Sequence, residues 1–302
     1  MTDITGIPAY QFDRVTNTSY LGKTSRNSFI FTAVADSEWT VGETAHVSYV
    51  MSLITDTVLQ HFSDRYQSDP IALNCFFLAK TITSNLIIEI EELKISKKGI
   101  CYARAILKQT KDLKRLESTE SYNPFEWIDK VHSIFTMKNM DSEKGVTYIY
   151  KNPLQHPLDT LEPYTYPYMA DFVDCLFDTS SFAKDEKDVG KPEQTQVMTF
   201  KDGRPTDFKS IPYWCDMIIS SAALIGPAMT GGPVWCATIQ MEVQFKRKPT
   251  GQKITAHLIT KHIINGRFEI DGEIWNEQGE ILAITRHQSM IVPWSRNIEA
   301  KI

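Results

Sequence analysis

The chain has 302 residues, of which 42% are hydrophobic and 23% are charged, and its formal net charge is −5. This length allows two domains of ordinary size, each with its own core. The mild acidity argues against nucleic acid as a partner, because nucleic-acid binding requires a basic surface. The sequence also lacks the run of about 18 apolar residues that a membrane span requires.

A first structural unit is indicated near residues 39–109. The segment Trp39–Gly42 leads into Glu43–His61, where apolar residues recur at helical spacing and form one stripe. Three strand-like runs follow this helix, at Ile71–Leu78, Leu86–Leu93 and Ile100–Gln109. This order predicts a helix that packs against an antiparallel sheet.

The stretch at 111–194 differs in composition, being richer in charge, proline and aromatic residues. We interpret it as a linker between two domains, part of which packs over their interface. Within it, Tyr122–Phe135 and Tyr164–Phe177 are expected to form short helices.

A second unit near residues 201–292 repeats the order of the first. A helix is expected at about 210–224, with Ser210 as its N-cap and Pro212 in its first turn. Strands are expected at Val234–Phe245, Ile254–Ile264, Arg267–Trp275 and Glu280–Val292. Hairpin turns at Asn265-Gly266 and Asn276–Gly279 join the last three, because Asn and Gly tolerate the positive φ of tight turns. The chain therefore contains the same helix-and-strand unit twice.

The five cysteines are widely spaced and form no CxxC pair or Cys/His cluster, so neither a metal site nor a cofactor is predicted. Reduced, buried thiols are the expected state.

Several short motifs occur in a characteristic order at both ends of the chain. In the second unit they are Phe200–Pro205, Asp216, Ala237–Ile239, Gly266–Glu269 and Trp275–Ala283; in the first they are Asp36–Gly42 and Arg104–Gln109. Together they resemble the double-hotdog acyl-CoA thioesterase family. The resemblance implies an α+β fold in which each of two helices is wrapped by an antiparallel sheet, and the two sheets join edge to edge with both helices on one side. The expected boundaries are an N-terminal hotdog at 1–110, the linker at 111–194 and a C-terminal hotdog at 195–302.

The resemblance implies hydrolysis of a fatty acyl-CoA to free fatty acid and CoA, by an Asp, a Thr and a Gln that position water. A backbone N–H near a helix N-terminus would polarise the thioester carbonyl. Asp216 matches the Asp and lies in an apolar helix, where an unpaired carboxylate is costly. Thr238 matches the Thr, on a strand where alternation places it opposite Ala237, Ile239 and Met241. A structural role is the alternative for both residues.

The third position departs from the family pattern. Counting from Gly279 places His287 where the family has Gln, and Gln288 follows one residue later. In a regular strand Thr285 and His287 share one face and Gln288 points to the other, although a one-residue bulge would bring Gln288 into the site. We favour His287 as a residue that lines the site. The first unit also lacks the family's Gly-Gly pair. There His46 stands at a helix start, where an exposed or hydrogen-bonded histidine is the preferred interpretation and a pocket residue is the alternative.

Two alternatives to hydrolysis remain open. A double hotdog with an altered triad could be a dehydratase or a tailoring enzyme for polyketide or acyl thioesters, or a protein that binds acyl-CoA without turnover. The C-terminal Ala300-Lys301-Ile302 is similar to a peroxisomal address, so a peroxisomal location is expected, with the cytoplasm as the alternative. A homo-oligomer is possible.

Overall fold

The computed structural model describes residues 9–150 and 158–298. The tripeptide Ala300-Lys301-Ile302, on which the predicted peroxisomal address depends, lies outside these residues. Within the described ranges, no helix is long and apolar enough to cross a membrane.

The N-terminal copy wraps one long helix, α2 (Val47–Phe62), in a six-stranded antiparallel sheet. A short helix, α1 (Gln11–Val15), and a small hairpin of β3 (Thr40–Val41) and β4 (Thr44–Ala45) precede α2. The sheet strands are β1 (Ser19–Lys23), β2 (Phe29–Val34), β5 (Asp69–Phe77), β6 (Asn85–Lys94), β7 (Cys101–Thr110) and β8 (Trp127–Lys138). Their spatial order is β1-β2-β6-β7-β8-β5, so β5 forms the inner edge.

The C-terminal copy repeats this plan. Its helices are α3 (Ile211–Asp216), α4 (Ser221–Ile225) and α5 (Pro227–Thr230), and α6 (Ser295–Ile298) follows the last strand. Its strands are β9 (Glu162–Tyr164), β10 (Val173–Phe177), β11 (Glu193–Phe200), β12 (Val234–Phe245), β13 (Ile254–Ile259), β14 (Ile263–Ile264), β15 (Arg267–Asn276) and β16 (Ile281–Pro293). The spatial order is β12-β16-β15-β13-β11-β10-β9, and β14 pairs with β15.

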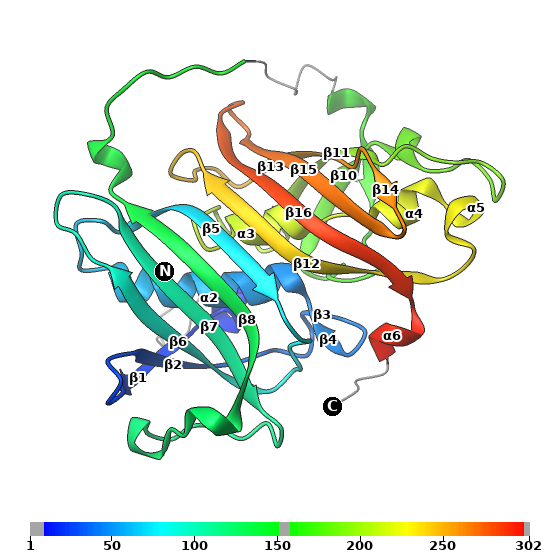
Figure 1. The fold of residues 1–302 in the computed structure, drawn as a ribbon. Helices are drawn as coiled ribbons and strands as arrows, with labels where there is room; N and C mark the ends of the chain where they lie inside the picture. Colours follow the sequence, from blue (N-terminus) through cyan, green and yellow to red (C-terminus); the bar gives the residue numbers. More distant parts are fainter. Residues whose placement is uncertain (1–8, 151–157, 299–302) are drawn as a thin grey trace.

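The two copies join where β12 pairs with β5 in an antiparallel arrangement, with Gln240–Gln244 opposite 72–76. The result is one 14-stranded sheet, and α2 and α3 pack together on one side of it (Figure 1). Going outward from the junction, β5-β8-β7-β6-β2 corresponds to β12-β16-β15-β13-β11. The predicted double hotdog with a continuous sheet is confirmed.

Helix α2 is buried on almost every side, because the sheet surrounds it and α3 covers the remainder. Tyr49, Leu53 and Phe62 are fully buried. The buried hydroxyls of Ser52 and Thr55 donate to the carbonyls of Ser48 and Met51, four residues earlier. These bonds remove the cost of burying the hydroxyl groups in an apolar interior.

The segment 111–194 is not a linker alone, because the structure places three sheet strands within it. Its β8 lies between β7 and β5, and β9 and β10 extend the C-terminal sheet beyond β11. The short helices expected at Tyr122–Phe135 and Tyr164–Phe177 are wrong. In β8 alternate residues such as Val131, Ser133 and Phe135 are buried, which is the period of a strand.

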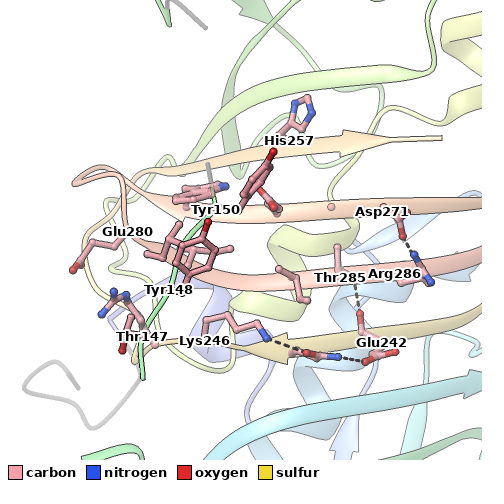
Figure 2. A pocket seen from close by; sticks show the side chains of 18 of the residues that line it. Thr147, Tyr148, Tyr150, Glu242, Lys246, His257, Asp271, Glu280, Thr285 and Arg286 are labelled. Atoms are coloured by element: carbon pink, nitrogen blue, oxygen red, sulfur yellow. Dashed lines mark hydrogen bonds and ion pairs between the residues drawn. The ribbon is translucent and has the colours of Figure 1, made fainter. Parts of the chain in front are cut away.

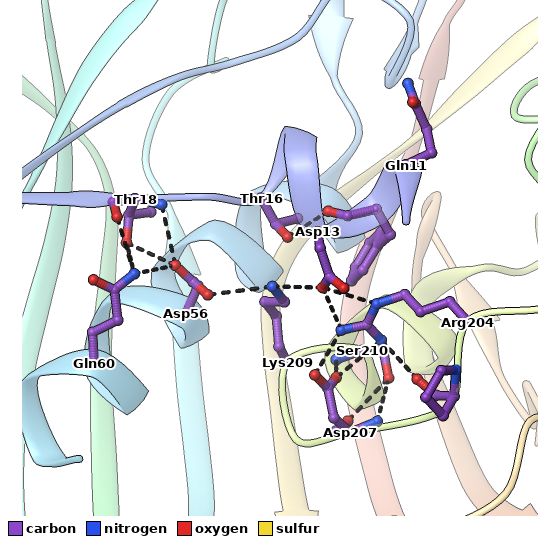
Figure 3. A network of polar contacts seen from close by, with 12 residues as sticks. Gln11, Asp13, Thr16, Thr18, Asp56, Gln60, Arg204, Asp207, Lys209 and Ser210 are labelled. Carbon is purple, nitrogen blue, oxygen red and sulfur yellow. Dashed lines mark hydrogen bonds and ion pairs between the residues drawn. The ribbon is translucent and has the colours of Figure 1, made fainter. Parts of the chain in front are cut away.

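A network of charged side chains ties α1 to the loop that precedes α3 (Figure 3). The guanidinium of Arg204 donates to Asp13 Oδ1 at 2.7 and 2.9 Å and to Asp207 Oδ2 at 2.6 Å. The Nζ of Lys209 lies 3.0 Å from Asp13 Oδ1 and 3.3 Å from Asp56 Oδ1, on α2. The network therefore holds the start of α3 in place against the N-terminal copy.

Candidate active site

A cavity of about 490 Å³ lies between the two copies, beside the β5–β12 junction. The N-terminal copy contributes the start of α2 and the segment that follows β5. The C-terminal copy contributes the residues that follow α3, the first half of β12 and part of β16. The polar residues among its walls include His46, Asp216, Ser220, Thr238 and Ser289. Most of the remaining surface is apolar or aromatic, as is typical of sites for small organic ligands.

Asp216 is the last residue of α3 and is 5% exposed. A helix was expected over about 210–224, but the structure interrupts it between α3 and α4. Two buried glutamines on β11 stabilise the interruption. The Nε2 of Gln196 donates to Met217 O at 2.6 Å, and that of Gln194 donates to Ile219 O at 2.9 Å. Carbonyl groups that leave the helix are thereby satisfied, and Asp216 stands at the break, facing the cavity.

Tyr166 supports the same break from the segment that was interpreted as a linker. Its O–H donates to Gln196 Oε1 at 2.6 Å, and Met217 O lies 3.2 Å from the same hydroxyl. Sequence reasoning missed Tyr166, Gln194 and Gln196. The only signal in the sequence was the pair of glutamines at alternate positions of a strand. This pattern does not reveal that the two side chains are buried, because their burial depends on how the strand packs in the sheet.

His287 lies behind Asp216 and does not line the cavity, contrary to the favoured interpretation. Its Nδ1 is 3.3 Å from Asp216 Oδ1, and its side chain is fully buried. Among the described residues, neither ring nitrogen has a partner in hydrogen-bond geometry. His287 therefore touches the carboxylate from the protein side and can affect a ligand only through Asp216.

Thr238 reaches the cavity because β12 contains a bulge. Thr238 pairs with Ser289, and Gln240 pairs with Gln288, so Ile239 is the extra residue. Directly opposed residues share a face of the sheet. Thr238 therefore lies on the inner face with Met241, although uninterrupted alternation predicted opposite faces.

Gln288 is exposed on the outer face of the sheet, away from Asp216. The last strand does contain an extra residue, Leu282, where it pairs with β15, but this bulge does not bring Gln288 inward. His287 stays on the inner face opposite Met241, and Gln288 stays on the outer face. Ser289, two residues beyond His287, occupies the inner face and is 2% exposed. Sequence reasoning missed Ser289, although its alternation with His287 was a usable signal.

His46 comes from the other copy and lies on the second side of Asp216. It is the N-cap of α2, where its Nδ1 accepts the backbone N–H of Ser48 at 3.2 Å and also contacts Ser48 Oγ. The same Nδ1 is 3.8 Å from Asp216 Oδ2. Burial lowers the pKa of His46, and the nearby Asp216 carboxylate only partly offsets this effect.

A larger hollow, of about 1320 Å³, lies on the outer face of the C-terminal sheet beneath Thr147, Tyr148 and Tyr150 (Figure 2). Several of its charged side chains pair with one another, as Asp271 and Arg286 do across β15 and β16 at 2.6 Å. The smaller cavity is the better candidate, because only there do a buried carboxylate and several hydroxyl groups face an apolar space. Among the described residues, no group of three His, Cys, Asp or Glu side chains is arranged to hold a metal ion.

A comparison with family models finds a match in the second half of the chain. Residues 152–291 match the family model of the acyl-CoA thioesterase C-terminal domain. The resemblance recognised in the sequence is thereby confirmed. The comparison with curated proteins gave no match.

Solved structures share the fold at low sequence identity. A protein assigned as a thioesterase II from Thermobifida fusca is 15% identical, with a TM-score of 0.75 over 95% of this chain and 99% of its own. The acyl-CoA thioesterase II TesB2 from Mycobacterium marinum is 13% identical, with a TM-score of 0.68 over 94% of this chain and 99% of its own. A dehydratase-cyclase domain of ambruticin biosynthesis is less similar, at 8% identity and a TM-score of 0.54 over 93% and 96% of the two chains.

Proposed function

We propose that the protein is an acyl-CoA thioesterase that hydrolyses fatty acyl-CoA to free fatty acid and CoA, with Asp216 as the residue that activates water. The observation that carries this proposal is a nearly buried carboxylate at a helix break, facing an apolar cavity between two hotdogs. The family model that matches the C-terminal copy supports the thioester as the reacting group.

In the proposed reaction, the Asp216 carboxylate accepts a proton from water while the water oxygen attacks the thioester carbonyl carbon. The tetrahedral intermediate then collapses, the C–S bond breaks, and the departing thiolate of CoA takes the proton from Asp216, which restores the carboxylate. Thr238 and Ser289 face each other across β12 and β16, so their hydroxyl groups can hold the water in line. His287 contacts the carboxylate at 3.3 Å from the side opposite the cavity.

One contact favours a second candidate, the dehydration of a hydroxyacyl thioester. His46 and Asp216 come from opposite copies and approach to 3.8 Å, as an acid and a base acting on neighbouring carbons would. However, the Nδ1 that faces Asp216 already accepts the Ser48 N–H. The neutral ring then carries its proton on Nε2 and has no free lone pair with which to remove a proton from the substrate, so hydrolysis is preferred.

A panel of acyl-CoAs of different chain lengths tests the proposal. Hydrolysis releases free thiol and fatty acid in equal amounts, whereas dehydration alters the acyl chain and releases no thiol. A protein that only binds the ligand gives neither product. Absence of thiol release across saturated and 3-hydroxy acyl-CoAs would reject the thioesterase assignment.

A further inference from the structure

We propose that His46 is a catalytic residue of this site and that its Nε2–H donates a hydrogen bond to the thioester carbonyl oxygen. This inference rests on the proposed function, because it assigns a second role in the same reaction. It also makes the reaction depend on both copies, since His46 belongs to the N-terminal copy and Asp216 to the C-terminal copy.

The first argument is the tautomer of His46. A backbone N–H always donates, so the 3.2 Å contact from Ser48 N requires a lone pair on Nδ1. A neutral imidazole that accepts at Nδ1 carries its proton on Nε2. Ser48 Oγ also contacts Nδ1 and restricts rotation of the ring. His46 is therefore held as a donor through the nitrogen that is not used for capping.

The second argument is charge. Burial favours the neutral form of His46 by lowering its pKa, and the N-terminus of a helix likewise disfavours a positive charge. A neutral imidazole donates a hydrogen bond without transferring its proton. It can therefore stabilise the negative charge that develops on the carbonyl oxygen while Asp216 accepts the proton of water.

The third argument is position. His46 lines the same cavity as Asp216, and its ring lies close to the carboxylate without forming a hydrogen bond to it. A carbonyl carbon attacked by water at Asp216 must have its oxygen within a few ångströms of that water. The 16-residue helix α2 begins at this point, so its dipole adds to the stabilisation supplied by the side chain.

Two variants of His46 separate catalysis from capping, because each keeps one of the two functions. In His46→Asn, the side-chain oxygen still accepts the Ser48 N–H as an N-cap, but the distal donor is lost. In His46→Gln, an amide N–H reaches about as far as Nε2, but the short-range cap is lost. We expect His46→Asn to retain the urea midpoint of the parent protein. Its kcat for octanoyl-CoA should fall about 100-fold to 1000-fold, which is typical for loss of one oxyanion donor, with little change in KM.

We expect His46→Gln to show the opposite pattern, with a lower urea midpoint and a kcat at least tenfold above that of His46→Asn. The exposed His262, changed to Asn, is the matched control and should leave both quantities unchanged. Equal or greater kcat in His46→Asn than in His46→Gln would overturn the proposal, as would His46→Asn activity close to that of the parent protein.

An infrared measurement tests the contact without turnover. In the Asp216→Asn background, the C=O band of bound octanoyl-CoA labelled with ¹³C at the carbonyl should shift to lower wavenumber than that of the free thioester. Adding His46→Asn should abolish most of this shift. A shift that is independent of His46 rejects the donor, whereas a His46-dependent shift in a protein that releases no thiol retains the donor and rejects only the thioesterase function.

Discussion

Replacement of Asp216 by Asn should separate catalysis from stability, because the carboxylate is buried at a cost to the fold. Asp216 is 5% exposed, and its ion pairs in the structure are with two histidines, at 3.3 and 3.8 Å. Neither is a permanent cation, so the negative charge gains little in return for its burial. The amide has the same size without the charge. We therefore expect the free energy of unfolding to stay within about 1 kcal/mol of the parent value, or to rise.

The same substitution should remove most of the activity. Loss of a positioned general base typically lowers the rate by about 10²-fold to 10⁴-fold, which corresponds to about 2.7–5.4 kcal/mol of activation free energy. Release of CoA can be followed with a thiol reagent, since four of the five cysteines are buried and Cys236 is only partly accessible. The exposed Asp174, changed to Asn, is the control. A variant that loses more than about 2 kcal/mol of stability while the folded fraction keeps near-parent kcat would refute the reasoning, because Asp216 would then be a structural carboxylate.

Three further predictions concern the residues that hold the site. Arg204→Met should lower the free energy of unfolding, measured in urea, by about 3 kcal/mol. This value is at the low end for breaking a buried ion pair, because Lys209 still neutralises Asp13. An unchanged urea midpoint would contradict this prediction. Burial alone raises the pKa of Asp13, but hydrogen bonds from Arg204 and the charge of Lys209 outweigh it and lower the pKa overall. The stability that Asp13 contributes should therefore be complete above its unfolded pKa of about 3.9 and be lost as pH falls through the lower folded value; a stability difference between the parent and Asp13→Asn that vanishes already at pH 6 would be inconsistent. Gln196→Leu leaves the Met217 carbonyl without its shortest donor. We expect kcat to fall about tenfold with little change in KM. If Gln196→Leu lowers kcat by the same factor in the parent protein and in the Asp216→Asn variant, Gln196 does not act through Asp216.

The sequence was sufficient to predict the fold because the duplication is visible in local patterns. A helix followed by antiparallel strands, present twice, leaves each unit with one apolar face to bury, and joining two such sheets at their edges is the observed solution. The fourth strand of the first copy was missed, although the second copy contains its counterpart, β16. Strand β8 follows a long charged segment, and its Trp127 and Phe135 were assigned to a helix although Asn123-Pro124, a turn signal, stands just before the strand.

The candidate site was less predictable, because it depends on pairing between distant strands. Ala237, Ile239 and Met241 alternate without interruption in the sequence, so nothing local reveals that Ile239 is a bulge residue. The extra residue becomes apparent only when β12 is aligned with β16. The consequence is large, since one residue of register exchanges the inner and outer faces of a strand.

The contribution of the N-terminal copy to the site has the same origin. The sequence offered His46 as a pocket residue only as an alternative, and its place beside Asp216 follows from the β5–β12 junction, which brings the beginning of α2 to the break after α3. In the proposed reaction each copy supplies part of the chemistry: the C-terminal copy supplies the carboxylate and the two hydroxyl groups, and the N-terminal copy supplies the imidazole donor. Since the cavity walls come from both copies, the junction that closes the sheet is also what assembles the site. The first copy therefore remains part of the candidate site although it lacks the family's glycine pair.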